Sequence, residues 1–310
     1  MASGDFSKSL LDENDSDSRA ITPNLSRFSG KVAIVTGSSS GLGEVVALRL
    51  AREGACVTLT GRDKTRLAAM VSRCQAAARD GEESGDTKQE ADVTERFLAV
   101  VGNLTAAETR KRIVSQTIAT FGRLDVLVSN AGIFTTHNDL SEVSEENFDE
   151  MIATNVKTCF FMVQLAAPHL EQTKGNVVIV SSTLSVMNWP AAVLYSLSKA
   201  ALDKLTFTFA LTLAPKGVRV NGVNPSFIPT RVIREWAKSE EAERETAHGF
   251  AAAIGPLHPL HGRCATADEF ADTVLFAASD EARYVTGQRI VCDAGAHLVG
   301  AFSALSAGSE

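Results

Sequence analysis

Short β-branched runs alternate with helical stretches from Lys31 onward, and this alternation restricts the chain to one fold class. Most of the runs are apolar at successive positions, as strands require when helices cover both faces of a parallel sheet. The predicted strands occupy residues 32–35, 57–60, 98–101, 126–128, 177–180, 218–220 and 289–291. Stretches with helical periodicity include residues 41–53, 105–121, 144–171 and 192–214. The pattern predicts an α/β fold, a single Rossmann-like, doubly wound domain with about seven parallel strands flanked by helices.

The composition fits one globular domain between two tails. A chain of 310 residues, 45% hydrophobic and 22% charged, suits one domain or at most two. Residues 1–28 are rich in Ser, Asp, Glu and Asn and are expected to form a flexible tail, the domain is expected to span 29–298, and 299–310 to form a C-terminal tail. The polar segment from Arg79 to Glu90 is expected to be an exposed loop.

Charge and cysteine usage indicate a soluble, cytoplasmic protein. The net charge of -7 and the lack of a Lys/Arg cluster argue against nucleic acid or an anionic membrane surface as the main partner. The five cysteines are scattered, odd in number and without metal-ligand spacing, which favours reduced thiols. We expect no signal peptide, mitochondrial presequence, peroxisomal ending or membrane span.

A glycine-rich turn follows the first predicted strand and leads directly into a helix. Such glycines allow a tight turn, close approach of the backbone to a phosphate and close helix–strand packing, while the helix N-terminus offers unpaired N–H groups. A mere turn is the alternative, but the strand–turn–helix context favours dinucleotide binding. The predicted cofactor-binding residues here are Gly37, Ser39, Ser40, Gly41, Leu42 and Gly43.

The end of the second predicted strand bears on the choice of cofactor. An NAD site usually places a carboxylate there for the ribose 2′-hydroxyl, whereas a 2′-phosphate requires a cation. Arg62 follows Gly61 and therefore favours NADP(H), with NAD(H) as a second possibility. The alternative is that Arg62 is a solvated surface charge and Asp63 caps the next helix.

A serine, a tyrosine and a lysine form the candidate catalytic group. Ser182 follows a predicted buried strand, and Tyr195 and Lys199 are one helical turn apart on one face of a helix. The neighbouring ammonium is expected to favour the phenolate and to lower the pKa of Tyr195 from about 10. By itself the Y-x-x-x-K pattern occurs by chance in many helices, so the assignment depends on the other motifs.

These motifs together resemble the short-chain dehydrogenase/reductase family over residues 29 to 298. They are T-G-x-x-x-G-x-G at Thr36–Gly43, the triplet Asn130, Ala131 and Gly132, and Ser182, Tyr195 and Lys199 in the order and at the separations that the family uses. The resemblance implies that the triplet supports the central strand beside the cofactor. It also implies that Asn155 joins a proton relay to solvent, although a buried asparagine is more often satisfied by backbone.

Two further cofactor segments rest on the resemblance. The pair that contacts adenine matches either Asp92–Val93, which no strand precedes, or Asn103–Leu104, and we choose Asn103 and Leu104, with asparagine in place of the usual aspartate. Beyond the sixth strand, Pro225, Ser226, Ile228 and Thr230 are expected near the nicotinamide. Ser226 replaces the family's glycine, which puts the local backbone conformation in doubt because serine tolerates a positive φ poorly.

The resemblance implies an NADP(H)-dependent oxidoreductase that transfers a hydride reversibly between the nicotinamide and a small-molecule carbonyl or secondary alcohol. Tyr195 is then the general acid/base, Ser182 donates to the substrate oxygen, and Lys199 holds the ribose. The alternatives are a non-catalytic NADP-binding sensor or scaffold and an isomerase or dehydratase. We expect a homodimer or homotetramer. We expect no metal, because His248, His258 and His261 are irregularly spaced and are interpreted as surface-loop histidines.

Overall fold

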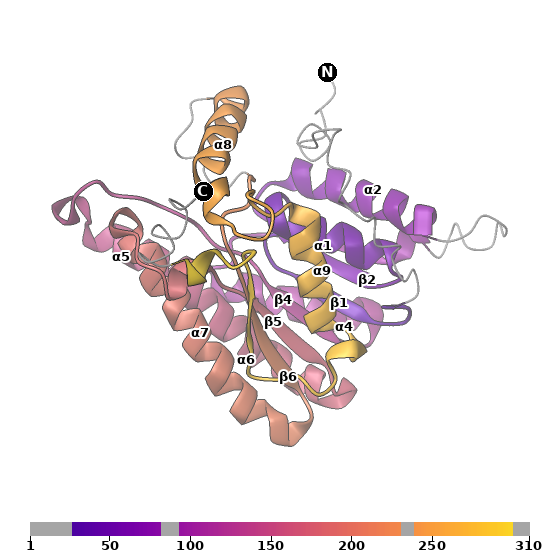
Figure 1. Ribbon diagram of the computed structural model, residues 1–310. Helices are drawn as coiled ribbons and strands as arrows, with labels where there is room; N and C mark the ends of the chain where they lie inside the picture. The colour runs from indigo at the N-terminus through magenta and orange to yellow at the C-terminus, as the bar shows by residue number, and fades with distance from the viewer. Residues whose placement is uncertain (1–26, 82–92, 231–238, 300–310) are drawn as a thin grey trace.

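The computed structural model describes residues 27–81, 93–230 and 239–299 and contains one parallel sheet with the strand order β3-β2-β1-β4-β5-β6-β7 (Figure 1). The predicted Rossmann-like fold is confirmed. The strands are β1 (Val32–Val35), β2 (Cys56–Gly61), β3 (Phe97–Val101), β4 (Val126–Ser129), β5 (Asn176–Val180), β6 (Arg219–Pro225) and β7 (Arg289–Cys292).

Helices cover both faces of this sheet, because successive side chains of each buried strand point to opposite faces. Ala33 and Val35 pack with α1, α2 and α9 on one face, and Ile34 packs with α4, α6 and α7 on the other. These helices are α1 (Gly41–Arg52), α2 (Lys64–Gly81), α4 (Ala107–Phe121), α6 (Thr158–Thr173), α7 (Val193–Leu213) and α9 (Ala267–Ala278). The shorter α5 (Glu145–Met151) precedes α6, and α8 (Glu240–Ile254) stands above the sheet in Figure 1.

Three predicted boundaries differ from the structure. The sixth strand continues to Pro225 because its residues are buried and paired with β5 and then β7. The long helix expected over 144–171 is divided by a π-helical turn at Ile152–Lys157. Helix α2 extends to Gly81, so residues 79–81 are helical where a loop was expected, and the other residues of that expected loop lie outside the described ones.

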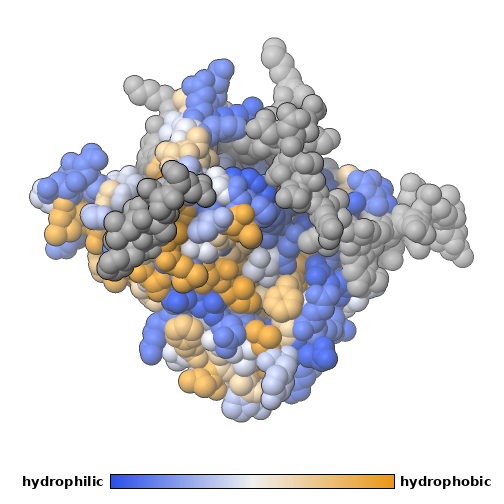
Figure 2. All heavy atoms as spheres, viewed as in Figure 1, coloured by the Kyte–Doolittle hydropathy of each residue, from blue (hydrophilic) through white to orange (hydrophobic). Residues whose placement is uncertain are grey.

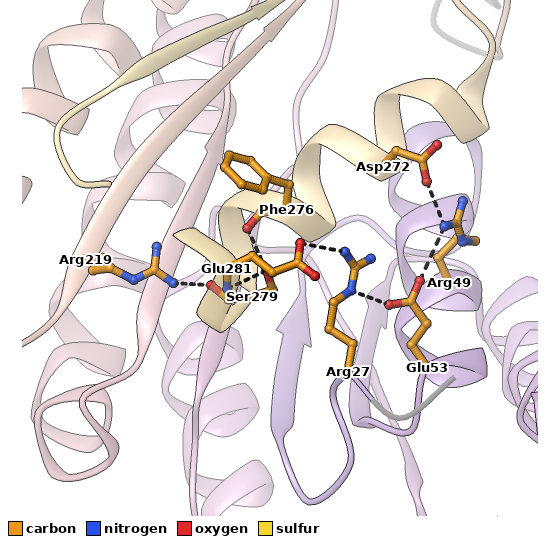
Figure 3. A network of polar contacts seen from close by, with 8 residues as sticks. All are labelled: Arg27, Arg49, Glu53, Arg219, Asp272, Phe276, Ser279 and Glu281. Carbon is orange, nitrogen blue, oxygen red and sulfur yellow. Dashed lines mark hydrogen bonds and ion pairs between the residues drawn. The ribbon is translucent and has the colours of Figure 1, made fainter. Parts of the chain in front are cut away.

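An ion-pair network ties the beginning of the described chain to α1 and α9 (Figure 3). Glu53 is fully buried and accepts from Arg27 at 2.7 Å and from Arg49 at 3.3 Å, and Arg49 also reaches Asp272 at 2.7 Å. Phe28 beside it is buried in the core. Arg27 and Phe28, which the composition assigned to the tail, therefore belong to the folded domain.

The outer surfaces of α6 and α7 carry exposed apolar side chains. Leu211 is 80% exposed, and Phe160, Leu197 and Phe207 are each exposed by more than a third. Figure 2 shows hydrophobic residues gathered beside α7. Contiguous apolar surface of this kind is typical of a protein contact. Within the described parts of the chain, no helix is long and apolar enough to cross a membrane.

Candidate active site

A cavity of 990 Å³ opens at the carboxyl ends of the strands, where the strand order reverses between β1 and β4. Ligands of open α/β sheets bind at this position. All the predicted cofactor-binding residues except Gly43 line the cavity. They are Gly37, Ser39, Ser40, Gly41, Leu42, Arg62, Asn103, Leu104, Asn130, Ala131, Gly132, Tyr195, Lys199, Pro225, Ser226, Ile228 and Thr230.

The turn between β1 and α1 depends on its glycines. Gly37 and Gly41 have φ values of +66° and +64°, a conformation that other residues rarely adopt. Gly43 is buried instead of lining the cavity, and a Cβ there would overlap the Asn130 side chain and the Gly37 carbonyl. Ser40 is the N-cap residue of α1, and its side chain does not cap the helix. The first N–H groups of α1 are thus available to an anion such as a pyrophosphate.

Thr36 fastens the glycine-rich turn to the loop after β4. Its hydroxyl oxygen accepts from the backbone N–H groups of Asn130 at 2.9 Å and Ala131 at 3.0 Å. The Asn130 amide in turn donates to the Thr36 carbonyl at 3.0 Å. These partly buried hydrogen bonds hold two walls of the cavity together.

The ends of β2 and β3 form the far side of the cofactor half. Arg62 is exposed and lines the cavity, while Asp63 accepts the backbone N–H of Arg66 at 3.0 Å in the first turn of α2. The capping alternative thus applies to Asp63. Of the two adenine candidates, Asn103–Leu104 lies in the cavity just beyond β3. Val93 is buried in the core and Asp92 lies outside the described residues.

Ser182, Tyr195 and Lys199 converge on the same cavity from two elements. Ser182 lies beyond β5, where its hydroxyl oxygen accepts from the Leu184 N–H at 3.2 Å, and it is near enough to the Tyr195 phenol to affect its pKa. Tyr195 and Lys199 belong to the first turns of α7. The Lys199 ammonium is buried, donates to the Val180 carbonyl at 2.9 Å and lies 5.3 Å from the centre of the Tyr195 ring.

The predicted direction of the Tyr195 pKa shift is wrong for this geometry. Burial raises the pKa of Tyr195 to about 12, and the hydrogen bond from Ser182 lowers it only in part. Burial also lowers the pKa of Lys199 to about 8, against the smaller opposing effects of Cys159 and Asp203. Desolvation disfavours the charged form of each group and is the largest effect on both pKa values. The phenol is therefore neutral at pH 7, and the ammonium is charged.

Asn155 lies behind the cavity in the π-helical turn and is buried. Its amide oxygen accepts from Ile133 N–H at 2.8 Å, and its amide nitrogen donates to the Ile133 carbonyl and the Ser198 hydroxyl, each at 3.0 Å. Among the described residues these contacts do not include Lys199, and the expected part of Asn155 in a proton relay to solvent stays a prediction. Asn155 joins the loop after Gly132 to α7.

Comparisons with known proteins match this architecture. The family described as Enoyl-(Acyl carrier protein) reductase matches residues 37–297. A dehydrogenase/reductase SDR family member 4 of Caenorhabditis elegans is 31% identical over 88% of this chain and 97% of its own length. The chain belongs to the short-chain dehydrogenase/reductase family. As such it is an oxidoreductase that acts on CH–OH or carbonyl groups with NAD(P).

Other short-chain dehydrogenases/reductases agree in sequence and in structure. A 3-oxoacyl-[acyl-carrier-protein] reductase FabG of Thermotoga maritima is 35% identical over 87% of this chain and 98% of its own. A Caenorhabditis elegans member of the family, solved with its cofactor, has a TM-score of 0.76 at 31% identity and covers 90% of this chain and 99% of its own. Both overlaps span nearly the whole relative.

Ser226, the residue that departs from the pattern of short-chain dehydrogenases/reductases, has a hydrogen-bond partner that could not be predicted from the sequence. Ser226 has no positive φ, which removes the doubt about its backbone. Its hydroxyl lies 2.7 Å from His258 Nε2, and His258 Nδ1 lies 3.0 Å from the Ile254 carbonyl. Because a carbonyl only accepts, Nδ1 carries a proton, and in this tautomer Nε2 is the acceptor for the Ser226 hydroxyl. The interpretation of His258 as a surface histidine is wrong, because it is 2% exposed.

The hydrogen bonds that hold the Ser182 backbone in place were also not predicted from the sequence. The Asn224 amide nitrogen lies 3.0 Å from the Ser182 carbonyl and 2.9 Å from the buried carboxylate of Asp203, which Arg289 approaches at 3.5 Å. The asparagine before Pro225 was visible in the sequence, but its partner on α7 was not.

Among the described residues no cluster of three or more potential metal ligands exists.

Proposed function

We propose that the protein catalyses the reversible reduction of a ketone to a secondary alcohol with NADPH, and that Tyr195 is the general acid/base. The observation that carries the proposal is the convergence of Ser182, Tyr195 and Lys199 on the cavity that the glycine-rich turn also lines. A sensor or scaffold would need the cofactor half of this cavity but not a phenol and a serine hydroxyl that line it together beside a buried ammonium.

The lining residues fit a nicotinamide dinucleotide in position and chemistry. The free N–H groups of α1 and the turn from Gly37 to Leu42 would hold the pyrophosphate. Asn103 and Leu104 would contact the adenine, and Lys199 would hold the nicotinamide ribose. When bound, the reduced nicotinamide supplies a hydride to the carbonyl carbon.

The side chains of this chain then manage the proton and the charge on the substrate oxygen. Neutral Tyr195 donates its proton to the oxygen, and Ser182 donates a hydrogen bond that strengthens as negative charge develops there. The charged ammonium of Lys199 stabilises the phenolate that remains. The Asn224–Asp203 contacts keep the Ser182 segment in place during this step.

The preference for NADPH rests on Arg62. This arginine is exposed at the end of β2, and the neighbouring carboxylate of Asp63 is engaged at α2. Arg62 therefore provides a cation for a 2′-phosphate where a carboxylate for a 2′-hydroxyl would otherwise stand. A charge-assisted hydrogen bond of this kind contributes about 1.5–3 kcal/mol.

Titration and steady-state kinetics test both parts. The purified protein should consume NADPH in the presence of a ketone, and Tyr195→Phe should bind NADPH normally while turnover falls by about 10²- to 10⁴-fold. Arg62→Ala should weaken NADPH binding and leave NADH binding unchanged. Near wild-type turnover in Tyr195→Phe would overturn the mechanism and favour a cofactor-binding module, and equal affinity for NADH and NADPH would overturn the cofactor preference.

A further inference from the structure

Aromatic side chains form a wall of the cavity that starts at Tyr195 and leads away from the cofactor-binding residues. Phe134 meets the Tyr195 ring edge-on, with centroids 4.8 Å apart, and lies 6.0 Å from the ring of Trp189. Trp189 is stacked on Phe250 at 5.7 Å, and Phe227 meets Phe250 edge-on at 4.8 Å. All five residues line the same cavity. A continuous aromatic surface therefore extends from the candidate acid.

Four separate segments supply this wall, and their contacts hold it together. Phe134 follows β4, Trp189 precedes α7, Phe227 follows β6, and Phe250 lies on α8. The planes of Trp189 and Phe250 are only 21° apart, so these two rings present nearly parallel faces. Rings in both parallel and edge-on orientations match a ring system by offset stacking and edge contact better than they match small or polar molecules.

The outer rim of the cavity is apolar as well. Met187, Leu257 and Val299 line it, with exposed fractions of 37%, 53% and 37%. Exposed apolar side chains around a concave site mark a place where a ligand covers apolar surface. The ligand is thus large enough to reach from Tyr195 to the rim.

The charged residues that line the cavity also determine which ligands it favours. Among its described lining residues the cations are Arg62 and Lys199, and both belong to the proposed cofactor site. The lining carboxylates are those of Asp149 and Glu150, and both residues are exposed. This part of the cavity repels an anionic substituent and offers it no described cation.

We infer that the substrate is a neutral ketone, or the corresponding secondary alcohol, carried on a bulky apolar ring system that packs on the wall formed by Phe134, Trp189, Phe227 and Phe250. This inference rests on the proposed function. In the reduction the carbonyl carbon would receive a hydride, with its electron pair, from a C–H bond of bound NADPH, which would become NADP⁺. The C=O π electrons would move to the oxygen, which takes the Tyr195 proton and leaves the phenolate. Trp189 and Phe250 determine specificity and take no part in the chemistry.

The test compares ketones that differ in one property. 2-Tetralone is a neutral fused-ring ketone, decan-2-one is an open-chain ketone with the same number of carbon atoms, and 4-acetylbenzoate and its methyl ester differ in charge. With NADPH we expect kcat/KM for 2-tetralone to exceed that for decan-2-one by about tenfold or more, and the ester to exceed the acid similarly. Equal values within either pair would overturn the inference.

Variants connect this preference to the wall. Trp189→Leu and Phe250→Leu should lower kcat/KM for 2-tetralone by about 10- to 100-fold and change that for 2-butanone by less than about threefold. Phe276→Leu on α9, outside the cavity lining, is the matched control and should change neither. Equal losses for both ketones would show that the variants disturb the fold, and no loss for 2-tetralone would show that it does not use the wall. Either result overturns the inference.

A binding measurement separates this inference from the proposed function. Calorimetric titration of Tyr195→Phe with 2-tetralone in the presence of NADPH should give saturable binding that Trp189→Leu weakens in the same background. Binding without turnover in the wild type would refute the proposed reaction and leave the wall as a ring-binding site. Turnover of small or anionic ketones without 2-tetralone binding would refute the substrate class and leave the reaction intact.

Discussion

Replacement of Lys199 by methionine should make the protein more stable and inactive. Lys199 is 4% exposed, and burial lowers the pKa of its ammonium from the ordinary 10.5 to about 8. At pH 7 the folded protein therefore carries a buried charge that the unfolded chain exposes to water. A pKa difference of this size corresponds to roughly 3 kcal/mol of lost stability.

Part of this gain is offset by the contact that the variant loses. The ammonium donates to the Val180 carbonyl at 2.9 Å, and an acceptor left without its donor costs about 1–2 kcal/mol. Methionine keeps the apolar stem and its packing. We therefore expect a net gain of roughly 1–2 kcal/mol in the free energy of unfolding, which raises the Tm of a domain of this size by roughly 2–4 °C.

The pH dependence of the stability difference between the wild type and Lys199→Met follows from the lowered pKa of Lys199. Between pH 8 and 10.5 the unfolded chain binds the lysine proton more tightly than the folded protein does. Stability of the wild type relative to the variant therefore rises with pH in this window. The advantage of Lys199→Met should be fully present below pH 8 and should shrink toward pH 10.

Thermal unfolding of the cofactor-free protein, followed by circular dichroism at pH 7, 8 and 9, measures this effect. The matched control is Lys204→Met on the same helix, where the side chain is exposed and the change should be within about 0.5 kcal/mol. A Lys199→Met variant that melts at or below the wild-type temperature at pH 7 would refute the reasoning. So would an advantage over wild type that does not narrow as the pH rises.

Three other regions of the molecule give predictions. Glu53→Ala should cost about 3 kcal/mol in urea unfolding because it removes the fully buried carboxylate that Arg27 and Arg49 share, whereas Glu171→Ala, which breaks a more exposed pair, should cost under about 1 kcal/mol; equal costs would contradict the burial argument. Ser226→Ala should cost about 1–2 kcal/mol, because buried His258 loses its donor, and an unchanged Tm would show that the bond contributes nothing. Light scattering at micromolar concentration should give a dimer or tetramer that Leu211→Glu weakens, and a wild-type monomer would refute the proposed interface.

The parts of the fold that the sequence predicts are those governed by local periodicity and turn chemistry. Runs such as Ala33 to Val35 are apolar at every position because helices cover both faces of the sheet. This pattern can be recognised from the sequence alone. Gly37 and Gly41 mark a turn because their φ values are positive. The π-helical turn at Ile152–Lys157 carries no such signal, since its residues continue the helical periodicity.

The parts that the sequence did not predict depend on contacts between distant segments. His258 is buried because the hydroxyl of Ser226 and the carbonyl of Ile254 satisfy its ring, and spacing between histidines holds no information about either. The wall of Phe134, Trp189 and Phe250 likewise unites segments that no short motif connects. Each becomes visible only when the loops beyond β4, β5 and β6 meet at one edge of the sheet.

The Tyr195–Lys199 pair shows that a sequence motif can identify the residues of a site without predicting their protonation states. Spacing on a helix places the ammonium near the phenol, and Coulomb attraction alone predicts a lower tyrosine pKa. The same packing that closes the site also removes water from both groups, and this effect is the larger one. A buried neutral phenol is the form that can donate a proton to a developing alkoxide, so the desolvation that opposes the phenolate suits Tyr195 to its proposed role as the acid in reduction. Alcohol oxidation requires the phenolate instead. Because burial raises the pKa of Tyr195, we expect oxidation to be faster at higher pH.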